Sequence, residues 1–214
     1  MSQSSRFQEM ESRLTELRRN MLPDEFSPTG DYTDKDLDLA RGYRLLVHAE
    51  IESYLEDIAK DTIIESIRNW DNNQKPSLTL ISFLAAYHSG WNIDEGIENE
   101  EIIKLAKNRP KIKDSVKEAI NCAQRQYIQY IKDNHGVKEN NIKKLILPLG
   151  IQMDEIDGTW LATINSFGTN RGETAHNSKR ATGQINPKDE YKTTQDLLDG
   201  LRNLDSAIAH ISSK

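Results

Sequence analysis

The sequence has few of the residues that build disulfide-rich, membrane-spanning or β-rich proteins. Its one cysteine, Cys122, excludes an internal disulfide framework and any zinc site that needs several cysteines. No apolar run approaches the roughly 20 residues that a membrane-spanning helix needs. The start of the chain, MSQSSRFQEMESR, has no apolar segment typical of a secretory signal. We therefore expect a cytoplasmic protein without a membrane partner.

Glycine-rich phosphate loops, internal repeats and β-rich segments are missing as well. What the 214 residues do contain is 29% charged residues, together with apolar residues at alternating spacings of three and four. That spacing is the period of an amphipathic helix. The net charge of −6 argues against a protein that coats nucleic acid without specificity. The sequence therefore predicts an all-α bundle of about six or seven helices.

The individual helices are predicted from these stripes and from their start and stop signals. A first helix over residues 7–22 has a narrow apolar seam suited to packing on a partner helix. Proline and glycine then interrupt the chain, so we divide it into an N-terminal helical extension, 1–28, and an all-α domain, 29–214. His135-Gly136 is interpreted as a helix stop without a catalytic role. The helices expected in the domain cover residues 34–70, 77–89, 100–108, 111–133, 140–147, about 154–175, and 187 onward.

One polar row interrupts the apolar pattern of the longest predicted helix. The row consists of Arg41, Arg44, His48 and Glu52, each about one turn from the next. We interpret it as a solvated or salt-bridged helix face. The alternative is a supporting role beside an active site, with Glu50 or Glu52 orienting an arginine.

The stretch Asn170–Asn177 holds the strongest candidate for a catalytic site. Arg171 can hold a phosphate through two parallel hydrogen bonds, and His176 can move a proton near neutral pH. This pair continues an apolar helix face, whereas Arg41 and His48 lie on the polar row. Five positions of a regular helix place two side chains about 140° apart. Arg171 and His176 therefore meet at one phosphate only if the helix ends between them or a second copy completes the site.

Four features together resemble the HEPN superfamily, and most of all its RiboL-PSP-HEPN branch. They are Val47–Glu52 (VHAEIE), Leu147–Ile151 (LPLGI), Arg171-x4-His176 with Ala175 before the histidine, and Ile185–Pro187 before a leucine-striped last helix. The resemblance covers residues from about 30 to 212. It implies a helical bundle that acts as a metal-independent endoribonuclease in a toxin–antitoxin or antiviral defence system, without a cofactor.

The resemblance also implies roles for individual residues. Arg171 and His176 would be catalytic, in a site formed where two protomers face each other, and no metal would be bound. The partners would be an RNA substrate, a second copy of the chain, and a cognate antitoxin or other defence-system protein. Supporting residues would be Glu173, Asn177 and Glu50, and residues that contact RNA would be Lys179 and Arg180.

One position departs from the pattern of active members. The residue after the arginine is commonly polar in them, and here it is Gly172. Either Glu173 takes over this role or the site is weaker than usual. Because some HEPN proteins are inactive antitoxins or helical binding modules, the alternative function is a non-catalytic dimerisation or partner-binding module.

Overall fold

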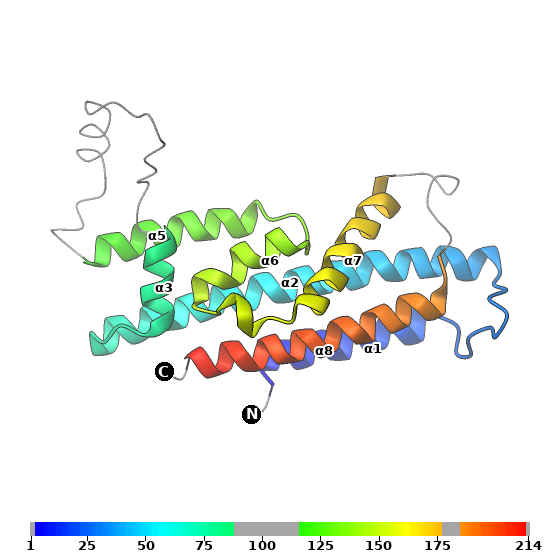
Figure 1. The fold of residues 1–214 in the computed structure, drawn as a ribbon, viewed down its shortest axis with the longest axis horizontal. Helices are drawn as coiled ribbons and strands as arrows, with labels where there is room; N and C mark the ends of the chain where they lie inside the picture. The colour runs from blue at the N-terminus through cyan, green and yellow to red at the C-terminus, as the bar shows by residue number, and fades with distance from the viewer. Residues whose placement is uncertain (1–2, 88–115, 177–184, 213–214) are drawn as a thin grey trace.

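The computed structural model describes residues 3–87, 116–176 and 185–212 and shows helices packed around one long central helix (Figure 1). Within these ranges the chain forms seven α-helices, two short 3-10 turns and no β-strand, which confirms the predicted all-α fold. The predicted helix over residues 100–108 lies outside them. The elements are α1 (Ser5–Met21), α2 (Asp34–Asn73), α3 (Leu78–Tyr87), α5 (Val116–Lys132), α6 (Glu139–Ile146), η1 (Leu147–Leu149), η2 (Met153–Glu155), α7 (Gly158–His176) and α8 (Pro187–Ser212).

The helix α2 is the element on which the other helices pack. Its start is fixed by a capping box, in which the backbone N–H of Asp36 donates to the Thr33 hydroxyl at 3.2 Å and the Thr33 N–H donates to the Asp36 carboxylate at 3.1 Å. Its end is closed by Gln74, which takes the left-handed conformation with φ of 54°. The largest fully buried side chains on it are Tyr43, Tyr54, Ile51, Leu55 and Ile63.

The helices α1 and α8 lie side by side against α2 (Figure 1). The seam predicted for α1 belongs to the same hydrophobic core as α2 and α8, and Phe7 and Met10 are fully buried in it. At the start of α1, the Asp205 carboxylate of α8 accepts hydrogen bonds from the Ser4 backbone N–H at 2.8 Å and the Ser4 hydroxyl at 2.5 Å. The helices that cover this seam are therefore in the same chain, while the domain boundary after residue 28 stays a prediction.

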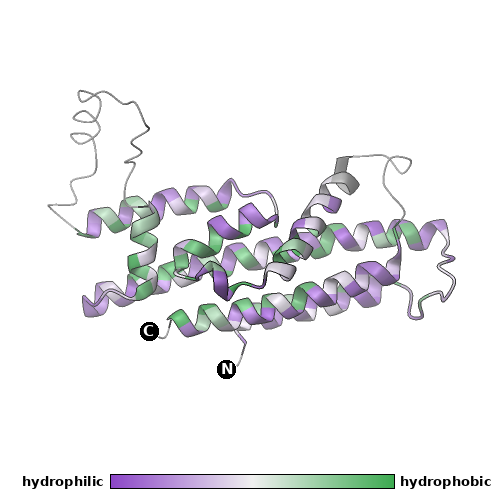
Figure 2. Cartoon of the chain, viewed as in Figure 1, coloured by the Kyte–Doolittle hydropathy of each residue, from purple (hydrophilic) through white to green (hydrophobic). Residues whose placement is uncertain are grey.

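The helices α3, α5 and α6 pack along the C-terminal half of α2 (Figure 1). Figure 2 shows that α3 is largely hydrophobic, whereas α8 carries both hydrophobic and hydrophilic residues along its length. The Tyr127 hydroxyl of α5 donates to the Leu145 carbonyl of α6 at 2.6 Å, and both residues are buried. This contact fixes the two helices relative to each other. It thereby also holds the ends of the loop that joins them, residues 133–138. No helix of the described ranges is both long and apolar enough to cross a membrane.

Candidate functional site

The candidate arginine, Arg171, lies on α7, which crosses α2 and projects from the bundle at its C-terminal end (Figure 1). The helix is capped by Asp157, whose carboxylate accepts a hydrogen bond from the Thr159 backbone N–H at 2.6 Å. From there it continues without a break to His176. The helix therefore does not end between Arg171 and His176, and a separation of five residues places the two positions about 140° apart around the helix axis.

Close packing holds the middle of α7 against its neighbours. Phe167, one turn before Arg171, is buried in the core. Gly168 follows it, and a Cβ at this position would lie 3.1 Å from Lys138 Cγ and 3.3 Å from the Lys138 backbone N. A side chain at this position would be in tight contact with the loop between α5 and α6, and Lys138 would have to shift by a few tenths of an ångström to make room for it. Arg171 itself is half-buried, next to this contact.

The polar row of α2 is partly covered by neighbouring helices: Arg41 and Arg44 are salt-bridged, as one of the two predicted forms of this face requires, whereas His48 is buried and not solvated. Arg44 forms a two-point ion pair with Glu190 of α8, with N–O distances of 2.9 and 2.6 Å and both side chains largely buried. His48 is only 1% exposed. Helical periodicity showed that these residues share one face, but it contained no information on which helices pack over that face.

His48 is a buried, neutral histidine next to α7. Its ring stacks on Phe167, with ring centroids 5.9 Å apart and an interplanar angle of 28°. Burial, and then the positive charge of Arg171, lowers the pKa of His48 from 6.5 to about 4. Its Nδ1 atom is 3.6 Å from Glu52 Oε2, which is beyond hydrogen-bond distance, and has no hydrogen-bond partner among the described residues. At neutral pH it therefore supports α7 as an uncharged ring.

Glu52 is the carboxylate of α2 that interacts with Arg171. Burial raises the pKa of Glu52, and the neighbouring Glu56 adds to this effect. The positive charges of Arg171 and His135 lower it, and so does a hydrogen bond from the backbone of Gly136. Two cationic side chains from different elements therefore lie within electrostatic reach of one half-buried carboxylate.

Glu50, which we predicted to support the arginine, has a different neighbour. Its carboxylate is 3.8 Å from the Arg13 guanidinium of α1. The sequence offered Glu50 and Glu52 as carboxylates that could orient an arginine. In the structure it is Glu52 that lies within electrostatic reach of Arg171. The sequence contains a signal for this choice, because Glu52 is one turn from His48 on the same row, whereas Glu50 is not.

The loop between α5 and α6 forms the third side of the cluster. The buried side chain of Asn134 donates to Glu56 Oε1 at 2.7 Å and to the Gly136 carbonyl at 3.2 Å. It also accepts a hydrogen bond from the Asn141 side chain at 2.8 Å. His135 lies between these anchored residues and is exposed. We had interpreted it as part of a helix stop, and no local pattern reveals its neighbours, because they come from helices distant in sequence.

Other predicted site residues lie outside the described part of the chain. Asn177, Lys179 and Arg180 fall between α7 and α8, and their roles stay predictions. The backbones of Glu173 and His176 belong to α7, but their side chains are not described. What the structure does bring together is a group that we call the Arg171 cluster, made up of Arg171, His48, Glu52, Glu56, Asn134 and His135.

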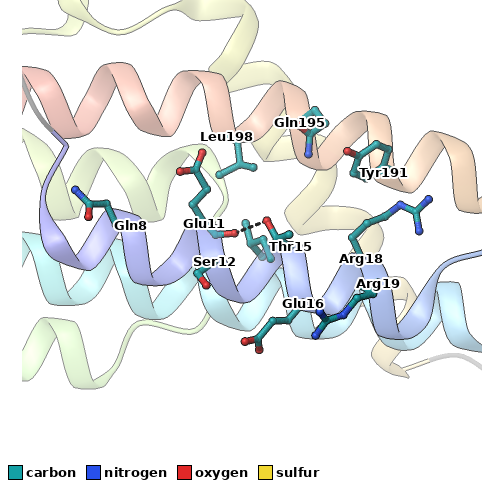
Figure 3. A pocket seen from close by; sticks show the side chains of 11 residues that line it. Gln8, Glu11, Ser12, Thr15, Glu16, Arg18, Arg19, Tyr191, Gln195 and Leu198 are labelled. Carbon is teal, nitrogen blue, oxygen red and sulfur yellow. Dashed lines mark hydrogen bonds between the residues drawn. The ribbon is translucent and has the colours of Figure 1, made fainter. Parts of the chain in front are cut away.

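A separate groove of about 620 Å³ runs between α1 and α8 (Figure 3). Side chains of both charge signs line it, among them Glu11, Glu16 and Arg18. The Arg18 guanidinium is already engaged, since it lies 4.8 Å from the ring centroid of Phe26 and 5.1 Å from that of Tyr191. None of the residues that line this groove belongs to the Arg171 cluster, so the groove is not where we look for phosphate chemistry.

The cluster contains an arginine, which suits phosphate binding, and the exposed histidine His135, which suits proton transfer. Within the described part of the chain, no group of three or more His, Cys, Asp and Glu side chains could hold a metal ion. A family model described as RiboL-PSP-HEPN matches residues 8–210 of the chain. Searches of curated proteins and of solved structures gave no significant match.

Proposed function

The chain belongs to the RiboL-PSP-HEPN family, and on that premise we propose that it is a metal-independent endoribonuclease. One observation carries the proposal: Arg171 is half-buried on α7, with the carboxylate of Glu52 in its electrostatic reach and His176 at the end of the same helix. An arginine oriented in this way offers two parallel N–H donors to the oxygens of a phosphodiester. The motif itself thus contributes the cation and the proton carrier that cleavage needs.

In the proposed reaction, the 2′-hydroxyl of RNA attacks its neighbouring phosphate. His176 removes the hydroxyl proton, while Arg171 holds the non-bridging oxygens, on which negative charge develops in the transition state. The products are a 2′,3′-cyclic phosphate and a 5′-hydroxyl end. Because the nucleophile belongs to RNA, DNA is not cleaved.

We propose that the complete site needs two copies of the chain. The helix α7 is continuous from Arg171 to His176, so in one copy the two positions are about 140° apart around the helix axis. A two-fold axis next to the projecting end of α7 would bring the arginine of one copy to the histidine of the other. Such a homodimer fits a cytoplasmic toxin–antitoxin or antiviral defence system, in which a cognate antitoxin or another partner restrains the activity.

The test is cleavage of single-stranded RNA in excess EDTA, with analysis of the ends produced. His176→Ala should lose about 10²–10⁴-fold in rate, the usual contribution of one acid–base group. Arg171→Lys should also fail, because lysine keeps the charge but has no planar two-point donor. The matched controls are Arg68→Lys and His210→Ala, both at exposed positions outside the cluster, and they should cleave like the wild type. Activity that needs added magnesium, or products with 5′-phosphate ends, would contradict the mechanism.

A second function is favoured by Gly172. Glycine has no side chain, so the position after the arginine lacks the polar group common in active members of the superfamily. The chain would then be a non-catalytic dimerisation or partner-binding module. Overexpression in a test cell separates the two functions, because only a ribonuclease should show toxicity that His176→Ala removes.

A further inference from the structure

The exposed His135 is held near Arg171 by anchors on both sides of its loop. On the α2 side, Asn134 donates to Glu56 at 2.7 Å, and the Gly136 backbone N–H donates to Glu52. Gly136 has φ of 153°, a backbone conformation that glycine adopts more readily than other residues. The residues immediately before and after His135 are therefore both fixed to carboxylates of α2.

On the α7 side, the loop is fixed one turn before the candidate arginine. The Glu139 backbone N–H donates to Asn165 Oδ1 at 3.3 Å. Gly168, three residues before Arg171, brings the α7 backbone against Lys138, as described above. The loop thus bridges α2 and α7 close to Arg171, and its exposed histidine and Arg171 both lie within electrostatic reach of Glu52.

We propose that His135 is a second acid–base residue of the ribonuclease site, which gives a proton to the 5′-oxygen as that oxygen leaves. This inference rests on the proposed function. In that reaction a proton leaves the 2′-hydroxyl while another must reach the departing oxygen, and one histidine cannot do both in the same step. His48 cannot serve, because it is 1% exposed and packed against Phe167. His135 is exposed and lies within electrostatic reach of the carboxylate of Glu52.

The bonds and protons of this step balance without another reactant. The 2′-oxygen forms a bond to phosphorus as the bond from phosphorus to the 5′-oxygen breaks. His176 takes the proton of the 2′-hydroxyl, and the imidazolium of His135 gives its proton to the 5′-oxygen. Arg171 holds the same non-bridging oxygens throughout. The two histidines then return to their starting states by exchanging protons with water.

The test compares two forms of one RNA with the full-length protein. The first is an RNA with a mapped cleavage position, and the second has sulfur in place of the leaving 5′-oxygen at that position. A thiol has a pKa of about 8.5, so the sulfur leaves as a thiolate and needs no proton donor. His135→Gln should lose about 10²–10⁴-fold on the normal RNA and cleave the sulfur-containing RNA nearly as fast as the wild type. His176→Ala should be impaired on both, since both need removal of the 2′-hydroxyl proton.

Each other outcome has a defined meaning. Undiminished cleavage of the normal RNA by His135→Gln overturns the inference and leaves the proposed function standing. An equal loss on both RNAs also overturns it, because the residue would then not act on the leaving group. A wild-type protein that cleaves neither RNA overturns the proposed function and this inference with it. His210→Gln, an exposed histidine on the last turn of α8, is the matched control and should behave like the wild type on both RNAs.

Discussion

Burial separates the roles of two histidines in the Arg171 cluster. His48 is enclosed between α2 and α7, where loss of water and the charge of Arg171 both disfavour its protonated form. His135 is exposed on a loop next to Glu52. A residue that must exchange protons with substrate and water needs exposure, whereas a residue that supports packing needs none. We therefore assign His48 to stability and His135 to chemistry.

The first prediction concerns His48 and pH. The unfolded chain binds a proton at His48 near pH 6.5, and the folded chain only near pH 4, so the unfolded state binds more protons between these values. Stability from this residue is present above pH 6.5 and is lost as the pH falls towards 4. Between about pH 7.5 and about pH 5 the loss should be about 2 kcal/mol. Urea unfolding at the two pH values measures it.

His48→Gln is the informative variant, because it keeps a polar side chain but cannot be protonated in this range. The difference in unfolding free energy between the two pH values should be smaller in this variant than in the wild type. His210→Gln is the control, and it should leave the difference unchanged. An equal pH dependence in the wild type and in His48→Gln would show that His48 is not buried in neutral form.

Two glycines in the C-terminal half of α7 have different surroundings. Gly168 touches the backbone of the α5–α6 loop, whereas Gly172 lies in open space within the described chain. Both glycines weaken a helix by the same intrinsic amount, roughly 1 kcal/mol relative to alanine. Only the first has a packing reason in the structure.

The second prediction therefore compares the same substitution, glycine to alanine, at two positions of α7. Gly172→Ala should stabilise the fold, by up to about 1 kcal/mol, because the added methyl group meets nothing. Gly168→Ala should destabilise it, by about 1–3 kcal/mol, because the methyl group would overlap with Lys138. Urea unfolding of both variants provides the comparison. Stabilisation by Gly168→Ala would mean that α7 does not pack closely on the loop.

The third prediction concerns the attachment of α1 to α8. The carboxylate of Asp205 is 2% exposed and accepts hydrogen bonds from the backbone and hydroxyl of Ser4, and from the Tyr54 hydroxyl at 2.9 Å. Asp205→Asn replaces an acceptor oxygen by an NH₂ group that faces these donors. The loss should be about 2–4 kcal/mol, since hydrogen bonds to buried charged groups are among the strongest. Faster proteolysis near residues 22–33 should accompany it, because α1 would detach more readily.

Asp199→Asn is the control for this prediction. It lies on the same helix, but its side chain is 75% exposed and pairs with Arg202 at 2.8 Å. A surface ion pair of this kind contributes little to stability. If Asp199→Asn and Asp205→Asn had equal effects, the buried contact would not be what holds α1 in place.

At the scale of the whole molecule, Arg171 and His176 occupy positions about 140° apart around one helix axis, and the proposed reaction needs both at one phosphate. The described chain is one bundle with a shared core, and α7 is the helix whose end projects from it (Figure 1). A projecting helix end with a polar, half-buried arginine is well suited to meet its own copy across a two-fold axis. The proposed dimer follows from this geometry and from the family.

The fourth prediction is that two inactive variants restore activity when they are combined. In a mixed dimer of Arg171→Ala and His176→Ala chains, one of the two sites contains an intact arginine from one copy and an intact histidine from the other. With random pairing, half of the dimers are mixed, so co-expression should restore about a quarter of wild-type activity. Each variant alone should be inactive. The measurement is RNA cleavage by the co-purified pair.

Sedimentation equilibrium provides the independent check on the dimer. The wild type and both variants should sediment as dimers at micromolar concentration. Full activity from a protein that sediments only as a monomer would overturn the two-copy site. A dimer without restored activity in the mixed preparation would instead place both residues of a site in the same copy.

The sequence by itself determined the elements of this protein. Thr33 with Asp36, Ser77 and Asn186 marked helix starts, and their side chains accept or exchange the expected hydrogen bonds with nearby backbone N–H groups. These signals are local, since a cap and the N–H that it satisfies are only a few residues apart. The apolar stripes likewise identified core residues such as Ile164 and Leu201, which are fully buried. Periodicity and capping therefore predicted the all-α fold correctly.

Only the tertiary structure decided which polar residues meet. The sequence placed His48 on a solvated or salt-bridged row and His135 in a helix stop, and it favoured Glu50 as a supporting carboxylate. In the structure His48 is buried, and His135 and Glu52 share the surroundings of Arg171. The reason is physical: helical periodicity assigns side chains to faces, but the packing of α7 and the α5–α6 loop on α2 determines which of those faces come together.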